Sequence, residues 1–136
     1  GKLDFIEYNK GGTSGSRVRF YRAVDGAIID LHKPHPGDIM KVMLQRRHLS
    51  PIYGQRTPLL STETDNLVIR KVPDILHTGH VHISEVINYR NVLGVNAGTW
   101  QSQTSFQKQM NITPTPAEAV VVDLSTLSYE KYCFMK

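Results

Sequence analysis

Two histidines separated by a single residue are the most chemically informative feature of this chain. His80 and His82 follow the apolar run 73–78, within the sequence Gly-His-Val-His. Neutral imidazole is the commonest metal ligand in proteins, and one intervening residue lets the two rings address different sides of a small metal cluster. Two histidines on a loop are also a common structural or solvated feature, so the metal hypothesis depends on what surrounds them.

The surroundings predict a loop at the end of a buried strand. Residues 73–78 form an apolar run typical of such a strand, and Gly79 permits a sharp turn after it. Segments 84–90 and 92–95 predict a second extended pair that ends in Asn-Ala-Gly-Thr-Trp. We therefore expect both histidines at a strand's C-terminal end, with their ring nitrogens facing a common cleft.

The sequence Gly-His-Val-His, followed by a hairpin and Val-Asn-Ala-Gly-Thr-Trp at 95–100, resembles the last motif of the calcineurin-like metallophosphoesterases. The resemblance implies an α/β fold, specifically a portion of a metallophosphoesterase β-sandwich, mostly β with one clear helix. It also implies that His80 and His82 bind different metals of a two-metal hydrolase, with Mn²⁺ or a similar divalent ion as cofactor. Such a metal pair activates hydroxide and neutralises phosphate oxygens during displacement.

A narrower resemblance runs from about residue 34 to residue 124. The segments 46–54, 72–82 and 99–112 are similar to the small subunit of the archaeal D-family DNA polymerase. That family implies a 3′–5′ exonuclease acting on DNA phosphodiesters, with the large polymerising subunit as partner. We interpret residues 1–136 as the C-terminal part of a single metallophosphoesterase domain, with 1–33 weakly matched and 34–124 strongly matched.

The resemblance also implies an incomplete site. Family members take further metal ligands from upstream motifs that include Gly-Asp-x-x-Asp and Asn-His, and neither pattern occurs in this chain. Gly37 and Asp38 are followed by Ile-Met-Lys and predict a helix start instead. The family also supplies a histidine where Arg22 stands here. We therefore expect weak or absent metal binding and no catalytic residue beyond the two histidine ligands.

Charge and aromatic residues suggest where partners bind. The net charge of +4 and a pI near 9.3 are compatible with a nucleic-acid partner. Arg22, Arg46 and Arg47 are candidate DNA contacts, although Arg46 and Arg47 also suit the negative end of a helix dipole, and Arg22 a solvated strand face. Trp100 and Phe106 flank a polar segment and are candidate contacts to the large subunit. A solvated loop, or buried aromatic rings, is the alternative.

The remaining patterns predict the secondary structure. The residues expected to be extended form two hairpins and a short strand: 3–8 with 17–21, 119–124 with 129–134, and 67–70. Apolar spacing over 37–47 predicts an amphipathic helix. Segment 27–31 fits strand or helix, 50–66 reads as an irregular loop, and 101–111 as a loop with one helical turn.

Several features limit the cellular setting. No run of 18 apolar residues and no signal-peptide pattern occurs, so we expect no membrane partner. The single cysteine, Cys133, cannot form an internal disulfide, which favours a reducing compartment such as the cytoplasm. We expect its side chain to be buried near a strand end. The chain begins with Gly1, which suggests a fragment or a processed product.

Three functions follow from these patterns. The first is part of a proofreading exonuclease subunit, with the isolated chain inactive. The second is a catalytically silent scaffold or assembly subunit of a DNA polymerase, which Arg22 and the absent motifs favour. The third is another metallophosphoesterase, against which the Arg-Arg-His-Leu-Ser-Pro-Ile-Tyr-Gly segment argues.

Overall fold

Seven strands and two helices make up the described part of the chain. A computed structural model describes residues 3–9, 17–23, 35–49, 63–109 and 111–135, with β1 and β2 described by their backbone. In chain order the elements are β1 (Leu3–Asn9), β2 (Arg17–Ala23), α1 (Pro36–Arg46), β3 (Ile75–Thr78), β4 (Glu85–Tyr89), β5 (Val92–Asn96), α2 (Ser105–Gln109), β6 (Glu118–Val122) and β7 (Tyr129–Cys133).

The strands form a five-stranded sheet of order β1-β2-β3-β5-β4 and a separate β6–β7 pair. The three central strands β2, β3 and β5 run parallel, whereas β1 and β4 are antiparallel to their neighbours. Parallel strands end at the same edge of a sheet, so Ala23, Thr78 and Asn96 all close the same edge. The expected hairpins are confirmed by the pairing of β1 with β2 and of β6 with β7.

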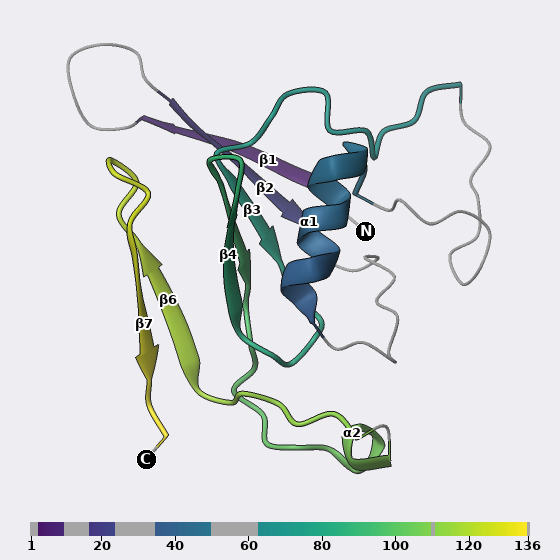
Figure 1. Cartoon of the computed structure of the whole chain (residues 1–136), viewed down its shortest axis with the longest axis vertical. Coiled ribbons are helices and arrows are strands. Elements are labelled where there is room, and N and C mark those ends of the chain that lie inside the picture. Colours follow the sequence, from purple (N-terminus) through teal and green to yellow (C-terminus); the bar gives the residue numbers. More distant parts are fainter. Residues whose placement is uncertain (1–2, 10–16, 24–34, 50–62, 110, 136) are drawn as a thin grey trace.

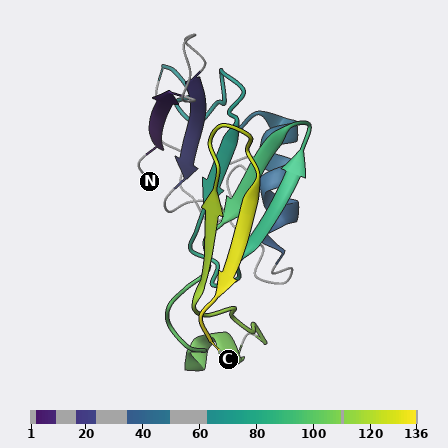
Figure 2. The same cartoon turned by 90° about the vertical axis from the view of Figure 1, so that its left-hand side faces the viewer.

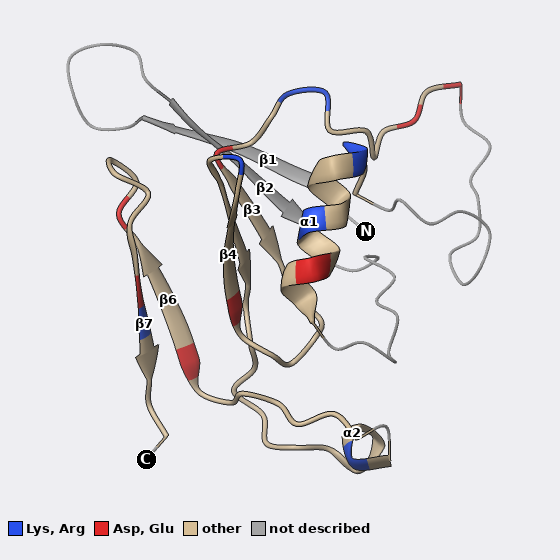
Figure 3. Ribbon diagram, viewed as in Figure 1, with Lys and Arg blue, Asp and Glu red and all other residues tan. Residues whose placement is uncertain are grey.

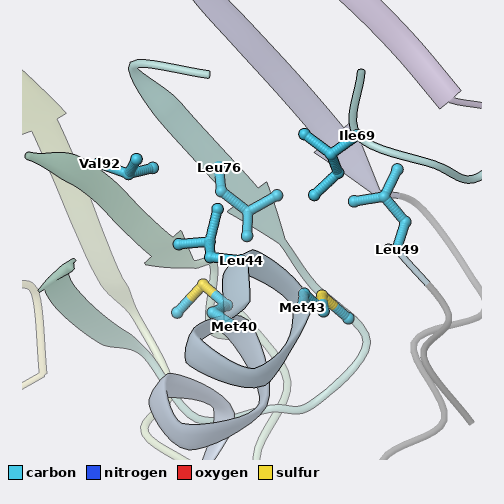
Figure 4. Close-up of a cluster of buried hydrophobic side chains, with 7 residues drawn as sticks. All are labelled: Met40, Met43, Leu44, Leu49, Ile69, Leu76 and Val92. Carbon is cyan, nitrogen blue, oxygen red and sulfur yellow. The ribbon is translucent and has the colours of Figure 1, made fainter. Parts of the chain in front are cut away.

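The part of the five-stranded sheet formed by β3, β5 and β4 lies between α1 on one face and the β6–β7 pair on the other (Figures 1 and 2). On one face α1 packs its methionines against the sheet; this first core consists of Met40, Met43, Leu44, Leu49, Ile69, Leu76 and Val92 (Figure 4). On the other face Val120 and Val122 of β6, with Leu124 and Leu127, pack on Ile75, Leu93 and Val95. Because it lies between these layers, β5 is buried along its whole length.

Local sequence explains why α1 forms where it does. Pro36 occupies the first turn, where its missing N–H costs nothing, and Asp38 adds negative charge near the positive end of the helix dipole. The N-cap residue His35 makes no side-chain cap; instead the N–H of Gly37 donates to Glu85 Oε2 at 2.8 Å. A Cβ at position 37 would lie 2.6 Å from Glu85 Oε1 and 2.7 Å from Ile87 Cγ2, so any larger residue there would displace these side chains.

Two sequence-based expectations need correction, and two others fall wholly or mostly outside the described residues. Residues 67–70 do not form a strand: Val68 makes a single bridge to His48. Cys133 is exposed, because all five residues of β7 face solvent at least in part. Segment 27–31 and most of the expected loop 50–66 are not described.

The imidazole of His48 pairs with an acidic side chain. Its Nε2 lies 2.7 Å from Asp65 Oδ2. The hydrogen bond from His48, with a second from the backbone N–H of Leu67, lowers the pKa of the Asp65 carboxyl below its ordinary value of 3.8. The pair joins the end of α1 to the segment that precedes β3.

The architecture is mixed α/β, mostly strands with one clear helix, as the sequence predicts. In the described ranges, no helix is long and apolar enough to cross a membrane.

We expect Met40→Ala to lower the free energy of unfolding by about 2–5 kcal/mol, because Met40 is fully buried in the first core. Val42 lies on the same helix with 42% of its surface exposed, so Val42→Ala should change stability by less than about 0.5 kcal/mol. Urea denaturation of both variants checks this. Equal losses would show that α1 does not pack on the sheet through Met40.

Candidate functional site

The two histidines lie on the loop that joins β3 to β4, residues 79–84, which follows Thr78 at the end of β3. We call this loop the histidine loop, and the end of the sheet from which it leaves the histidine edge. This placement at a strand's C-terminal end confirms the sequence prediction. His80 is exposed and His82 is half-buried. The neighbouring His77, within β3, is half-buried and pairs with Arg22 in the backbone register of β2 and β3. The strand end with the histidines is therefore also the end of β2 that carries Arg22.

The sharp turn after β3 is made by a histidine and not by the glycine before it. His80 has a φ of 72°, in the left-handed region that side chains rarely adopt. Gly79 lies outside that region, and a Cβ there would meet nothing within 4 Å. The expectation that Gly79 makes the turn is therefore wrong. Strained backbone of this kind often occurs at functional sites, where the surrounding structure must hold it in place.

A buried asparagine holds the histidine loop against the sheet. Asn96, only 1% exposed, ends β5 beside Thr78 of β3. Its amide Nδ2 donates to the carbonyl oxygens of Val81 and Ile83 at 3.0 and 2.7 Å. Its Oδ1 accepts a hydrogen bond from Thr78 Oγ1 at 2.7 Å. One side chain thus joins two strands to both sides of His82.

A second segment, just before β6, holds the same loop from another direction. The N–H of Thr115 donates to the carbonyl oxygen of His82 at 2.9 Å, and Thr115 Oγ1 accepts from the N–H of Ser84 at 2.6 Å. Lys131 of β7 donates to the carbonyl oxygen of Ser84 at 3.1 Å. The loop backbone is therefore fixed by side chains from β5, the β6 approach and β7.

The imidazole of His82 contacts the short helix α2. Gln107, 8% exposed, places its Nε2 at 2.5 Å from His82 Nδ1. Gln103 Nε2 donates to the carbonyl oxygen of Ile112 at 2.8 Å. Two glutamines of the polar segment 101–109 are therefore engaged within the protein itself, a role that the sequence pattern did not reveal. The expected helical turn is confirmed as α2.

The described residues do not by themselves make a complete metal site. Catalytic zinc sites, for comparison, take three ligands from the protein. Among the residues that the structure describes, no group of three or more His, Cys, Asp or Glu could hold a metal ion. His80 and His82 are the two candidates at this edge. One Asp-x-His sequence does occur in the chain, Asp30 to His32, but it lies outside the described residues.

The candidate DNA-binding arginines on α1 lie far from the histidine loop. The start of α1 bonds to Glu85, which pairs with Asn96 at the histidine edge. The other end carries Arg46 and Arg47, and Arg47 Nη1 donates to the carbonyl oxygen of Ile69, before β3 begins. Figure 3 shows the described Lys and Arg spread over several elements, without one gathering of positive charge at the histidine loop.

The aromatic candidates are exposed. Trp100 and Phe106 have 71% and 59% of their surface accessible, so the alternative of buried rings does not hold for them. The Trp100 ring lies 5.7 Å from the ring of Phe134, which follows β7 and is 64% exposed. Trp100 and Phe134 thus form an exposed aromatic pair, whereas Phe106 is exposed on α2.

These features describe an α/β protein with a braced histidine pair at the carboxyl edge of its parallel strands. Its relatives are small subunits of archaeal DNA polymerase II. The chain is 44% identical over 108 residues to the one from Pyrococcus furiosus, covering 79% of this chain and 18% of the relative. It is 46% identical over 112 residues to that of Archaeoglobus fulgidus, covering 79% of the chain and 23% of the relative.

A third relative, from Methanothermobacter thermautotrophicus, is 54% identical over 85 residues, covering 62% of the chain and 18% of the relative. The chain thus spans about a fifth of the length of the curated relatives that it matches. No protein-family model matches it.

We expect Asn96→Asp to lower the free energy of unfolding by about 1–3 kcal/mol. The change removes the buried donor to Val81 and Ile83 and keeps the acceptor for Thr78. Asn88→Asp, at an exposed position of β4, is the matched control. Urea denaturation measures the stability, and NMR of residues 79–84 reports the loop. If both variants behave alike, Asn96 does not brace the loop.

Proposed function

We propose that this chain is part of a DNA polymerase II small subunit and contributes to a metal-dependent 3′–5′ exonuclease that acts on DNA phosphodiesters. The observation that carries the proposal is the 42–54% identity to small subunits of that polymerase over a stretch containing both histidines. The large polymerase subunit is the partner that this proposal implies.

The chain's contribution is the histidine half of a site. When bound, Mn²⁺ or a similar divalent ion supplies activated hydroxide and positive charge for phosphate oxygens. His80 and His82 are the proposed ligands that this chain offers, and the others must come from residues beyond those described here. Asn96 and Thr115 keep the loop in one conformation, which matters because metal sites need their ligands preorganised. The metallophosphoesterase fold belongs to this proposal, and the layered α/β architecture is compatible with it.

A silent scaffold is the second candidate, and a specific feature favours it. Arg22 lies in register with His77, at the same sheet edge as the histidine loop. An arginine at this position cannot act as a metal ligand, because its guanidinium stays protonated and has no acceptor. The two candidates differ in whether the edge performs chemistry or only supports assembly.

We expect the isolated 136-residue chain to degrade no single-stranded DNA in the presence of Mn²⁺, because the described residues bring together only His80 and His82, which are too few to hold and bridge metals. Incubation with 3′-labelled DNA measures this. Degradation by the chain that His82→Ala abolishes would contradict the expectation and would mean that other residues of this chain complete the site.

The full-length small subunit that carries these residues separates the exonuclease from the scaffold. The exonuclease hypothesis predicts Mn²⁺-dependent release of nucleotides from 3′ ends, lost on His80→Ala or His82→Ala. Gln109→Ala, at an exposed position of α2, is the control and should retain activity. A full-length protein without this activity would favour the scaffold.

We also propose that residues 100–111 contribute to docking, on the large subunit or on another part of the parent protein. The exposure of Trp100 and Phe106 supports this, since Trp and Phe are enriched where proteins associate. In a pull-down with the large subunit, Phe106→Ala and Trp100→Ala should weaken capture, whereas Gln109→Ala should not. A deletion of 101–109 is a less specific variant, because it also removes the Gln107 contact to His82. Undiminished capture by Phe106→Ala, Trp100→Ala and the deletion would contradict the proposal.

A further inference from the structure

The orientation of the Gln107 side-chain amide is determined by the first turn of α2. The N–H of Thr104 donates to Gln107 Oε1 at 3.0 Å, while the N–H of Gln107 donates to Thr104 Oγ1 at 3.2 Å. This reciprocal pair is a capping box. A backbone N–H can only donate, so the Gln107 oxygen must face Thr104 and the NH₂ group must face the other way.

That NH₂ group faces His82. The amide nitrogen of Gln107 can only donate, so His82 Nδ1 must accept with its lone pair. A neutral imidazole has one lone pair and one N–H, and its hydrogen is therefore on Nε2. Reversing the amide would place an NH₂ group against the Thr104 N–H and would leave a donor at this buried position without an acceptor.

We propose that Gln107 is a positioning residue that holds His82 in the Nε2–H tautomer. In this arrangement neither ring nitrogen has a free lone pair: that of Nδ1 is engaged by Gln107, and Nε2 carries hydrogen. While the Gln107 contact is made, His82 is a hydrogen-bond donor at Nε2 and has no lone pair for a metal ion. Histidines that bind a metal instead donate their other N–H to an acceptor such as a carboxylate or carbonyl oxygen.

In the arrangement that the structure shows, His82 therefore cannot bind a metal ion. Whether it can do so is set by α2, which carries Gln107. Ligation by His82 requires release of the Gln107 contact, which would also disturb the capping box. This consequence for metal binding rests on the proposed function, whereas the tautomer itself rests only on the hydrogen bonds among Thr104, Gln107 and His82.

The tautomer is measured by ¹⁵N NMR of the histidine ring nitrogens in the whole 136-residue chain, without added metal and at a pH where the ring is neutral. We expect the His82 Nδ1 resonance at the position of an unprotonated nitrogen and Nε2 at that of a protonated one. Wild-type protein with hydrogen on Nδ1 would overturn the proposal without recourse to any variant.

Two charge-matched variants test the role of Gln107. In Gln107→Glu the carboxylate still accepts from Thr104, so the capping box remains, but an oxygen now faces Nδ1. The Nδ1 resonance should therefore shift to that of a protonated nitrogen. Gln109→Glu adds the same charge at an exposed position of α2 and should cause no such shift. An unshifted Nδ1 in Gln107→Glu, or an equal shift in both variants, would overturn the proposal.

Failure of the proposed exonuclease would not produce these outcomes. A full-length protein that lacks nuclease activity would leave the tautomer result unchanged, and a wrong tautomer would leave the nuclease assay unaffected. The two hypotheses therefore fail separately.

Discussion

The buried amide of Asn96 is the interaction on which the histidine edge depends. Asn96 ends β5, where the backbone groups that follow the parallel strands have no neighbouring strand to pair with. Its side chain bonds two loop carbonyl oxygens and the hydroxyl of Thr78. Because unsatisfied polar groups are costly in a buried setting, the loop has one favourable position. His80, which adopts the left-handed region, is directly followed by Val81, whose carbonyl oxygen Asn96 holds.

The edge is supported from more than one layer. The brace from β5 belongs to the five-stranded sheet, whereas Thr115 and Lys131 come from the segments that form the second sheet. Packing of Val120 and Val122 on the first sheet fixes these segments. A change in the packing between the two sheets is therefore transmitted to the backbone of His82 without any contact to its imidazole.

Periodicity and turn residues predicted α1, both hairpins and the strand before the histidines, because these depend on local patterns of apolar residues. Local sequence patterns did not predict contacts between residues that are distant in the sequence. Glu85 caps α1 from 48 positions away, and Gln107 reaches His82 across 25. The sequence predicts a turn at Gly79, but His80 makes it. A glycine in the sequence shows only that a positive φ is possible at that residue, and not that the residue adopts one. Cys133 was expected inside because cysteine usually is, but β7 is an outer strand.

The same reasoning applies to the polar segment around α2. Its low apolar content suggested a surface reserved for partners, yet a capping box and a buried glutamine account for part of it. A Thr-x-x-Gln pattern was readable at 104–107, and it would have predicted the helix start. It could not have predicted that the glutamine faces an imidazole, because that depends on how β5 and the histidine loop are placed in space.

The outer position of β7 has a consequence for how this chain behaves in concentrated solution. Within the described ranges β7 pairs only with β6, so one row of its backbone donors and acceptors has no neighbouring strand. Lysine often protects such an edge, but the ammonium group of Lys131 turns inward to Ser84 and Glu118. Tyr129 and Tyr132 are exposed on the same strand and favour β-pairing. Self-association through β7 would therefore compete with any protein that approaches from this side, and the chain would be best handled dilute.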